Sequence, residues 1–452
     1  MVPESRQFEA ALQVVKELRA AGHEAYLAGG CVRDLLLGHI PQDYDVATSA
    51  TPDAVLNLFK RTFAVGAHFG VVLVADNDEE GYITTEVATF RSDGAYSDGR
   101  HPDAVRYTQS AEEDVRRRDF TINGLLLDPL QSANDLRASV IDYVGGVADL
   151  DAGIIRAIGR PEARFEEDRL RMLRGVRFAA RLGFDLEPAT AAAIRQLAPR
   201  VHAVSRERVR DELTKMLTEG RARRAFELLD QTGLLSEVLP EVARMKGVEQ
   251  PPQFHPEGDV WTHTLMLLEQ LEAGCPLTLA WGALLHDVGK PPTFRRAPDR
   301  IRFDGHVEIG VAIAAEICRR FRFSNDETQQ ILALVENHMR FADAQRMKAS
   351  TLKRFFRLTV FEQHLALHRM DCLAGSGNLD HWEFVRERWL SMPEETVRPR
   401  PLITGRELIA AGYIPGAGFK EMLRAVEDAQ LEGTISTAEE ALQMVRQRFP
   451  KN

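Results

Sequence analysis

The chain has 452 residues, of which 44% are hydrophobic and 27% charged, and its formal net charge is −10. These values describe an ordinary globular protein that is long enough for about three compact units. We also find no apolar run long enough to cross a bilayer and no signal segment, which argues against a membrane-spanning or secreted protein. The four cysteines show no C-x-x-C spacing, which predicts reduced thiols in a cytoplasmic protein without a membrane partner.

The negative charge is unevenly distributed along the chain. From Arg156 to Arg224 there are 16 Arg and one Lys against 10 Asp and Glu, a net charge of about +7. A basic island inside an acidic chain predicts a surface for polyphosphate or nucleic acid. A helical surface covered with internal ion pairs is the alternative.

The first motif is a turn suited to phosphate. A helix expected at 4–22 and a strand expected at 24–28 precede two glycines, Gly29 and Gly30, and a helical stretch that contains Arg33. A Gly-Gly turn before a helix exposes backbone N–H groups, and an arginine one turn later adds a charged donor for the same phosphates. An ordinary tight turn is the alternative.

Two carboxylates follow the turn. Asp43 and Asp45 lie two positions apart, and such residues of a strand point to the same face. Paired carboxylates need a cation, and their hard oxygen ligands suit Mg²⁺. A hairpin is predicted at 70–75 and 82–90, and its Glu86 is either a third carboxylate at this metal or an ordinary sheet residue. The turn and the carboxylates together predict nucleotide chemistry.

A second basic motif follows a glycine-rich, polar loop predicted at 90–107. Residues 116–123 read RRRDFTIN. The arginines suit contacts to a triphosphate or a ribose, with Asp119 orienting one of them, and a basic helix end is the alternative. A strand is expected at 154–158, and from Pro161 onward the pattern predicts helices to the C-terminus.

These motifs resemble those of the tRNA nucleotidyltransferase and bacterial poly(A) polymerase family, class II type. GG-x-VRD followed by D-x-D is similar to the family's opening motif. R-R-D-x-x-x-N resembles its second motif, with Gly124 where the family has Ala. The resemblance implies that Asp43 and Asp45 are catalytic Mg²⁺ ligands. It also implies a set of nucleotide-binding residues, namely Gly29, Gly30, Arg33, Arg117, Arg118, Asp119 and Asn123.

Residues 166–182 are predicted to form an amphipathic helix, with charged residues opposite an apolar arc. In an Asp168–Arg171 pair, the carboxylate accepts from an exocyclic amino group and the guanidinium donates to a ring acceptor. Cytosine and adenine present an amino donor beside a ring acceptor on their pairing edge, which matches this pair. Guanine and uracil present the donor and acceptor in the reverse order, so the pair would reject them. An ion-paired helix face is the alternative.

The pattern E-D-x-x-R in this helix also resembles the family's base-selecting motif. The resemblance implies that CTP and ATP are the substrates. The nucleotide-binding residues that it implies here are Glu167, Asp168, Arg171, Arg174 and Arg177. The stretch at 206–217 resembles the helical neck of the family.

A second set of metal-binding residue types lies further along the chain. Four histidines and two aspartates occur in the order H…HD…H…H…D, namely His263, His286, Asp287, His306, His338 and Asp371. Such side chains converging from several helices suit Ni²⁺, Mn²⁺, Co²⁺ or Fe²⁺, and six ligands can hold two metals and activate a water. The order resembles that of HD-domain phosphohydrolases. His364 and His368 are expected at the surface or beside these ligands.

We therefore expect an α+β protein. It has a nucleotidyltransferase head with a small mixed β-sheet (1–155), a helical neck for base selection and RNA binding (156–225), a helical HD domain (226–385) and a helical tail (386–452). The resemblance implies template-independent addition of CCA to the 3′ end of tRNA by two-metal nucleotidyl transfer, with a second, phosphohydrolase activity in the HD domain. A poly(A) polymerase, an A-only tRNA nucleotidyltransferase and an HD phosphohydrolase with a nucleotide-binding head are the alternatives. In the family that the sequence resembles, enzymes that stop at CC tend to have a shortened loop here, so the resemblance disfavours addition of CC alone by a chain with a full-length loop at 90–107.

Overall fold

The chain divides into two compact units, Met1–Pro240 and Glu241–Asn452. The structure, a computed structural model, describes residues 5–63, 70–78, 81–93, 105–131, 136–253, 255–256 and 258–450. Within these ranges no helix has the length and apolar composition needed to cross a membrane. The four cysteines are free thiols, as predicted. Most of the loop predicted at 90–107 lies outside the described residues, and the cytoplasmic location stays a prediction.

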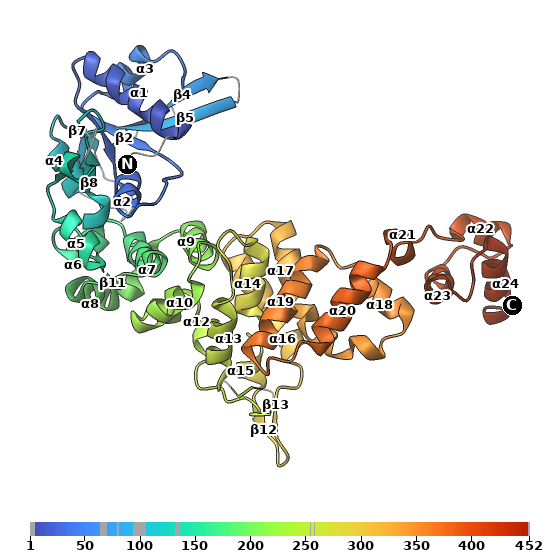
Figure 1. Cartoon of the computed structure of the whole chain (residues 1–452). Helices are drawn as coiled ribbons and strands as arrows, with labels where there is room; N and C mark the ends of the chain where they lie inside the picture. The colour runs from blue at the N-terminus through green and yellow to red at the C-terminus, as the bar shows by residue number, and fades with distance from the viewer. Residues whose placement is uncertain are drawn as a thin grey trace. The chain divides into compact units, whose positions relative to one another are not determined.

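A mixed β-sheet organises the first unit (Figure 1). Its strands are β1 (Ala25–Ala28), β2 (Asp45–Thr48), β3 (Thr62–Phe63), β4 (Val71–Asp78), β5 (Gly81–Thr89), β8 (Leu125–Leu127) and β9 (Val140–Asp142). They lie in the order β3–β4–β5–β2–β1–β8–β9, with β2 and β5 parallel and the other neighbours antiparallel. The predicted hairpin and mixed sheet are confirmed. A separate antiparallel pair consists of β6 (Arg91–Asp93) and β7 (Val105–Tyr107).

Helices and short 3₁₀ segments cover and connect these strands. They are α1 (Arg6–Ala20), α2 (Gly30–Leu36), α3 (Pro52–Leu58), α4 (Ala111–Arg116), η2 (Thr121–Asn123), η3 (Arg137–Ser139) and α5 (Gly146–Ala152). Ala111 and Val115 of α4 pack with Ala28 and Leu126 of the sheet. Leu27 points to the other face and is also fully buried, since successive strand residues alternate between faces. Both faces of the sheet are therefore covered.

The rest of the first unit is mainly helical. Its elements are β10 (Ile154–Ile155), α6 (Pro161–Glu167), α7 (Leu170–Leu182), β11 (Asp185–Leu186), α8 (Pro188–Leu197), η4 (Ala198–Ala203), α9 (Arg206–Thr218), α10 (Ala222–Gln231) and α11 (Leu234–Val238), and α12 (Pro240–Ala243) begins at its end. The strand predicted at 154–158 is shorter than expected, and it pairs in parallel with β11. The prediction of helices alone after Pro161 is wrong here, because Gly183 ends α7 in the left-handed region (φ 71°) and turns the chain back.

The prediction of one continuous helix over 166–182 is wrong at its N-terminal end. The α6 helix ends at Glu167, and the backbone of Asp168 is extended (φ −139°, ψ 107°) before α7 begins at Leu170. The carboxylate of Asp168 accepts a hydrogen bond from the backbone N–H of Leu170 at 3.0 Å, so it satisfies a donor at the start of the new helix. This break places Asp168 at a helix junction instead of on a helix face.

The second unit consists of helices and one short hairpin (Figure 1). The helices are α13 (Val260–Leu268), α14 (Leu277–Leu285), α15 (Lys290–Thr293), α16 (His306–Arg320), α17 (Asn325–Asn337), η5 (His338–Arg346), α18 (Ala349–Phe356), α19 (Phe361–Ala374), α20 (Asp380–Ser391), α21 (Glu394–Val397), α22 (Gly405–Ala410), α23 (Gly418–Glu432) and α24 (Ala438–Arg448). The hairpin pairs β12 (Arg295–Arg296) with β13 (Ile301–Arg302) in antiparallel fashion. It is a second exception to the prediction of helices alone.

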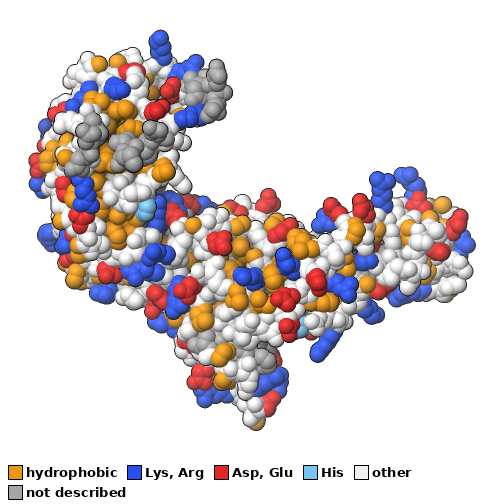
Figure 2. Space-filling model, viewed as in Figure 1, with side chains coloured by type: hydrophobic (Ala, Val, Ile, Leu, Met, Phe, Trp, Pro, Cys, Tyr) orange, Lys and Arg blue, Asp and Glu red, His pale blue; other side chains and the backbone are white. Residues whose placement is uncertain are grey.

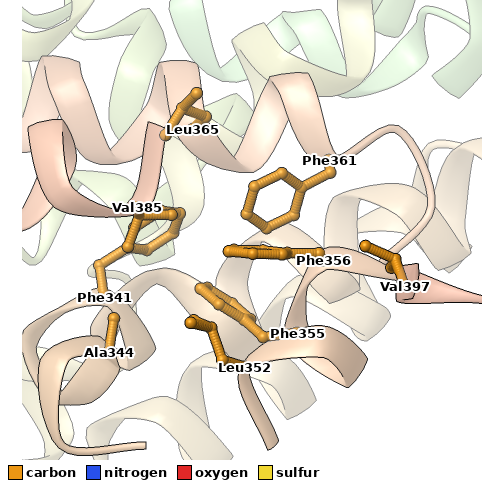
Figure 3. Close-up of a cluster of buried hydrophobic side chains, with 9 residues drawn as sticks. All are labelled: Phe341, Ala344, Leu352, Phe355, Phe356, Phe361, Leu365, Val385 and Val397. Carbon is orange, nitrogen blue, oxygen red and sulfur yellow. The ribbon is translucent and has the colours of Figure 1, made fainter. Parts of the chain in front are cut away.

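An aromatic cluster forms a core of the second unit (Figure 3). The rings of Phe341 and Phe355 pack edge to face with centroids 4.9 Å apart, and Phe361 packs on both. His364 lies beside Phe361 with ring centroids 6.3 Å apart and is 1% exposed. The surface position considered for His364 is therefore wrong. His368, at 8% exposure, stacks on Phe341 with centroids 4.2 Å apart.

The burial of His364 predicts a loss of stability in acid. Burial, with a smaller effect of Arg340, lowers the pKa of His364 to about 4. Protonation then favours the unfolded chain, whose histidine has a pKa of about 6.5, so stability falls as the pH drops from about 6.5 toward 4. The unfolding free energy of the wild type should fall between pH 7.5 and pH 4.5, and in His364→Leu this fall should be smaller by ~2 kcal/mol. Urea denaturation at the two pH values measures the difference. The exposed His39→Leu is the control, and equal pH profiles for the wild type and His364→Leu would contradict this account.

Candidate active sites

A single cleft in the first unit gathers almost all the residues predicted to bind nucleotide. Its volume is about 1090 Å³. The predicted residues that line it are Gly29, Gly30, Arg33, Asp43, Asp45, Arg117, Arg118, Asp119, Asn123, Asp168, Arg171, Arg174 and Arg177. Glu167 does not line the cleft, and its carboxylate instead pairs with Arg164 at 2.8 Å and Arg171 at 2.6 Å.

The Gly-Gly turn lies at the start of α2. Gly29 has φ 76° and ψ −126°, a conformation that favours glycine. A Cβ atom on Gly29 would lie 2.9 Å from the Nη1 atom of Arg118, so a side chain there would also displace the arginine. Arg33 is 3% exposed and donates to Asn123 Oδ1 at 2.8 Å and to Asp34 Oδ1 at 2.8 Å. The turn, the second motif and α2 thus form one connected wall of the cleft.

The carboxylates of the cleft fit a cation. Asp45 begins β2 and pairs in register with Glu86 of the parallel strand β5, so the two side chains share a face. Asp43 precedes the strand and is exposed. Burial, reinforced by Glu86 and Asp43 and opposed by Arg118, raises the pKa of Asp45 to about 6, and burial with Asp43 raises the pKa of Glu86. A divalent cation such as Mg²⁺ would relieve this repulsion and finds the oxygen ligands that it prefers.

The arginines of the second motif are held by a buried carboxylate. Arg117 and Arg118 pair with the two oxygens of Asp114 at 2.7 and 3.0 Å, and Asp114 is 2% exposed. Burial favours the neutral form of Asp114, but the two guanidinium groups outweigh it and lower its pKa. Sequence reasoning missed Asp114. A signal for it was present, because Asp114 stands three residues before Arg117 and four before Arg118, a spacing at which ion pairs form.

Asp119 joins the head to the helices that follow it. Its Oδ1 accepts from Asn123 Nδ2 at 3.1 Å, and its Oδ2 accepts from Arg174 Nε at 2.8 Å. Burial opposes ionisation, but Arg174 and Asn123 hold the pKa of Asp119 at about 2. The prediction that Asp119 orients one of the arginines of its own motif is wrong, because Asp119 pairs with Arg174, 55 residues away, while Asp114 holds Arg117 and Arg118.

The two residues predicted to read the base do not pair with each other. Asp168 forms a two-pronged ion pair with Arg208 of α9, with distances of 2.7 and 3.2 Å. Arg171 pairs with Glu167 and donates to the backbone oxygens of Arg164 and Arg117. Sequence reasoning missed Arg208 because no local pattern connects it to a residue 40 positions earlier.

Two further arginines of α7 and one of α2 surround an aromatic ring. The guanidinium carbons of Arg33, Arg174 and Arg177 lie 5.3, 5.2 and 4.4 Å from the centroid of the Phe178 ring. Arg177 is 5% exposed and pairs with Glu212 at 2.7 Å. Its position is therefore strongly constrained by packing as well as by charge.

The basic island of the first unit is partly neutralised by internal pairs. Besides the pairs above, Arg223 meets Glu227 at 2.9 Å and Arg224 meets Asp185 at 2.8 Å. On the face seen in Figure 2, basic side chains lie among acidic ones. The ion-pair alternative therefore accounts for part of the island, while Arg171, Arg174, Arg177 and Arg208 also line the cleft.

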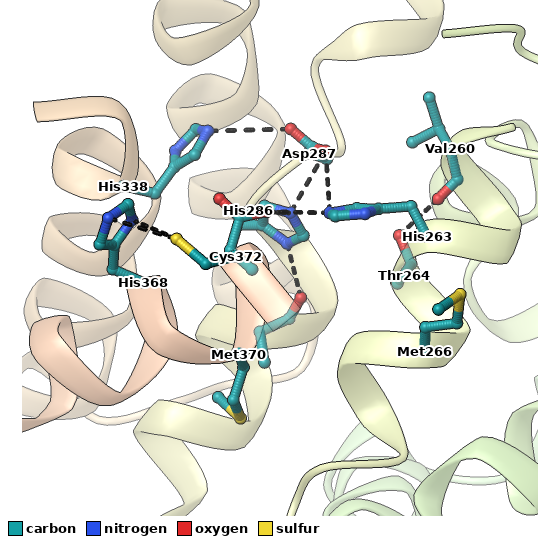
Figure 4. A network of polar contacts seen from close by, with 12 residues as sticks. Val260, His263, Thr264, Met266, His286, Asp287, His338, His368, Met370 and Cys372 are labelled. Atoms are coloured by element: carbon teal, nitrogen blue, oxygen red, sulfur yellow. Dashed lines mark hydrogen bonds and ion pairs between the residues drawn. The ribbon is translucent and has the colours of Figure 1, made fainter. Parts of the chain in front are cut away.

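The six residues of the second predicted metal site converge in the second unit. Figure 4 shows four of them, His263, His286, Asp287 and His338. His263, His286 and Asp371 form one group of three whose ligand atoms lie within 4.8 Å of one another. Asp287, His306 and His338 form a second such group. Two groups of three fit the expectation of two metals.

Backbone carbonyls orient three of the histidines. The Nδ1 atoms of His286, His306 and His338 lie 2.7–2.9 Å from the carbonyl oxygen three residues earlier. Their Nε2 atoms are buried, and those of His286 and His338 lie 3.2 and 3.7 Å from carboxylate oxygens of Asp287. The Nε2 atom of His306 has no hydrogen-bond partner among the described residues. A ring that donates through Nδ1 keeps its Nε2 lone pair for a metal, so this arrangement fits a transition-metal ion. Burial lowers the pKa of His338 to about 4, which keeps that ring neutral.

A lysine holds the central carboxylate of this site in its charged form. Lys290 Nζ lies 2.7 Å from Asp287 Oδ2 and donates to Gln250 Oε1 at 2.6 Å. Burial would raise the pKa of Asp287, but Lys290 and His286 keep it well below its usual range. The signal for Lys290 was present in the sequence, since it stands three residues after Asp287, one helical turn away.

Three protein-family models match successive regions of the chain, and the first and last of these regions contain residues of the two sites. The poly(A) polymerase head domain matches residues 25–156. The model described as the probable RNA and SrmB-binding site of polymerase A matches residues 183–246, and the HD domain matches residues 259–369.

Curated relatives match about half of the chain. The CCA-adding enzyme of Lactobacillus johnsonii is 41% identical over 266 residues, which is 58% of this chain and 64% of that protein. The CCA-adding enzyme of Geobacillus thermodenitrificans is 44% identical over 236 residues, 52% of this chain and 55% of that protein. The matched part is thus less than two thirds of the length of these relatives.

Solved structures extend the likeness along the chain. The Bacillus stearothermophilus CCA-adding enzyme in complex with CTP aligns with a TM-score of 0.73 and 29% identity, over 98% of this chain and 99% of that one. The Thermotoga maritima CCA-adding enzyme complexed with tRNA shares the fold alone, at 19% identity and a TM-score of 0.60 over 99% of this chain and 96% of that one. With the head, RNA-binding and HD regions matched in this order, the chain carries the domain set of the tRNA nucleotidyltransferase and poly(A) polymerase family, in the form with an HD domain.

Proposed function

We propose that this protein adds C and A nucleotides, as the sequence CCA, to the 3′ end of tRNA without a nucleic-acid template. The observation that carries the proposal is the single cleft that holds Asp43 and Asp45 beside the Gly29–Gly30 turn and the arginines of α7. The names of the relatives and the CTP-bound structural neighbour support tRNA, CTP and ATP as partners and substrates.

In the proposed reaction, the 3′-hydroxyl oxygen of the RNA attacks the α-phosphorus of the incoming nucleotide. The bond from that phosphorus to the bridging oxygen breaks, pyrophosphate leaves and the hydroxyl proton passes to solvent. Asp43 and Asp45 hold the cation, while Arg33 and Arg117 carry the charge of the triphosphate beside the N–H groups of Gly30. Bound Mg²⁺ lowers the pKa of the 3′-hydroxyl and stabilises the charge of the leaving group.

Base selection is proposed for Asp168 and Arg171, although each already has partners. A carboxylate offers about four acceptor positions. Asp168 uses three of them, two for Arg208 and one for the N–H of Leu170. One position remains for an exocyclic amino group of cytosine or adenine. Arg171 uses three N–H groups of its guanidinium, which leaves two to donate to a ring acceptor.

A phosphohydrolase activity is the second proposed function, located in the HD domain. The buried Nε2 atoms of His286, His306 and His338 support it, because they lie among the carboxylates of the site and are placed to bind a metal. We propose Ni²⁺, Mn²⁺, Co²⁺ or Fe²⁺ there, each of which activates a water when bound. In the net reaction, water adds to phosphorus, the ester P–O bond breaks and the released alcohol takes a proton.

Replacing the catalytic carboxylates tests the first proposal. Asp43→Ala and Asp45→Ala should each abolish incorporation of labelled CTP and ATP into tRNA, because neither variant can hold the cation. Asp53→Ala, an acidic residue in the first turn of α3 that does not line the cleft, should keep wild-type incorporation. If the two cleft variants still extend tRNA, the transferase proposal is wrong and the chain is an HD phosphohydrolase with a nucleotide-binding head.

Selectivity against UTP tests the proposed base contact. Asp168→Ala should lower the preference for CTP over UTP by about 1–3 kcal/mol, or roughly 5- to 150-fold in the ratio of kcat/KM. Affinity for the triphosphate should change less, because other residues hold it. Competition between labelled CTP and UTP measures the ratio, with the exposed Glu166→Ala as the control. A general loss of activity at unchanged selectivity would assign Asp168 a structural role only.

The HD site should act independently of the cleft. The double variant His286→Ala, Asp287→Ala should lose its transition metal and any hydrolysis of 2′,3′-cyclic or 2′-phosphate ends of RNA, while nucleotide addition stays close to wild type. Metal analysis of the purified protein and hydrolysis assays with Ni²⁺ or Mn²⁺ provide the readouts. A wild-type protein that binds no such metal and hydrolyses no phosphoester would refute the second function.

A further inference from the structure

Helix α9 lies beside α7 in the first unit and pairs with its charged residues (Figure 1). Three ion pairs follow one another in the same direction along both segments, from the residue that precedes α7 and the first turn of α9 onward. The pairs are Asp168–Arg208 at 2.7 Å, Arg177–Glu212 at 2.7 Å and Arg181–Glu219 at 3.8 Å. Arg208 is thus the member of this series that reaches the carboxylate proposed to read the base.

The contacts of Asp168 differ between its two carboxylate oxygens. Oδ1 accepts from Arg208 Nη1 at 3.2 Å and from the backbone N–H of Leu170 at 3.0 Å. Among the described residues, Oδ2 accepts only from Arg208 Nη2, at 2.7 Å. Because each carboxylate oxygen offers about two acceptor positions, the position that remains is on Oδ2. An amino group of a bound base would therefore be read by Oδ2 of Asp168.

The guanidinium group of Arg208 fixes the direction of that oxygen. A guanidinium that meets both oxygens of a carboxylate holds the plane of the carboxylate, whereas a single contact lets the carboxylate rotate about its last bond. The side chains of Arg208 and Asp168 are 24% and 16% exposed, so solvent screens this pair less than a surface pair. Both residues line the first cleft. A residue of α9, 40 positions along the chain, thus determines how Oδ2 is presented to the cleft.

We propose that Arg208 is a positioning residue for base selection, which aims Oδ2 of Asp168 at the amino group of cytosine or adenine. Arg208 acts through the carboxylate and does not touch the base. Uracil and guanine carry a carbonyl oxygen where cytosine and adenine carry that amino group, and a fixed carboxylate oxygen repels it. A carboxylate that is free to rotate can turn away from the carbonyl oxygen, so rejection of the wrong bases depends on Arg208. The inference rests on the proposed base-selecting role of Asp168.

Replacement of the guanidinium by other donors tests this role on the full-length enzyme with Mg²⁺. Arg208→Lys keeps the positive charge and Arg208→Gln keeps a donor, but neither can hold both oxygens of the carboxylate in the same way. In each variant the ratio of kcat/KM for CTP over UTP, on tRNA that lacks CCA, should fall about fivefold or more, the lower end for a lost bidentate contact. The ratio for ATP over GTP, on tRNA that ends in CC, should fall as well, because the same oxygen reads both amino groups. A merely structural role would lower the rates with right and wrong nucleotides alike and leave both ratios unchanged, which would overturn the proposal.

Two further variants show whether Arg208 acts through Asp168. Arg210→Lys is the matched control and should keep both ratios, since Arg210 lies on the same helix, pairs with Asp211 at 2.8 Å and is not among the described residues that line the cleft. The double variant Asp168→Ala, Arg208→Lys should be as selective as Asp168→Ala alone, because the second change has no carboxylate left to act on. A further loss of selectivity in the double variant would mean that Arg208 contacts the base itself, and would overturn the positioning role.

The same measurements separate this inference from the proposed base contact. If Asp168→Ala loses selectivity while Arg208→Lys and Arg208→Gln keep the wild-type ratios, the positioning role is overturned and the base contact of Asp168 stands. If the wild type extends tRNA selectively and neither Asp168→Ala nor the Arg208 variants change the ratios, the base contact fails and the positioning role fails with it. Loss of selectivity in all three single variants, without a further loss in the double variant, is the result that the inference predicts.

Discussion

The buried carboxylate of Asp119 is the constraint on which the first cleft depends. It holds Asn123 and Arg174 at once, and Asn123 in turn accepts from Arg33. Because this chain of bonds runs from the Gly-Gly helix through the second motif to α7, it fixes the relative positions of the two sides of the cleft, which we propose bind phosphate and select the base. Removing one partner would leave a buried charge unpaired, which is far more costly than losing a surface pair.

The two sites solve opposite electrostatic problems. In the first cleft, burial and repulsion between carboxylates raise the pKa of Asp45, and a hard cation relieves the strain. In the HD site, Lys290 keeps Asp287 charged while backbone carbonyl groups orient three histidines through Nδ1, so their Nε2 atoms suit softer metals. This difference explains how one chain can use two metals without sharing ligands between its two compact units.

Much of both sites followed from the sequence, because their residues stand at fixed spacings on local elements. The Gly-Gly turn, the D-x-D pair and the HD order each depend on a few neighbouring positions. The misses have a common physical cause. Arg208 reaches Asp168 across 40 residues through tertiary packing, and periodicity alone did not reveal the helix break at Asp168. The deep burial of His364 likewise depends on an aromatic cluster assembled from several helices.

The most direct test of the account is the product made by the wild-type enzyme. Purified protein is incubated with all four nucleoside triphosphates and Mg²⁺, using tRNAs that end before the CCA, after its first C and after its second C. The 3′ ends are then sequenced. The account predicts that each substrate is completed to CCA and extended no further. Long A tails, or incorporation of U or G at rates similar to those of C and A, would contradict it.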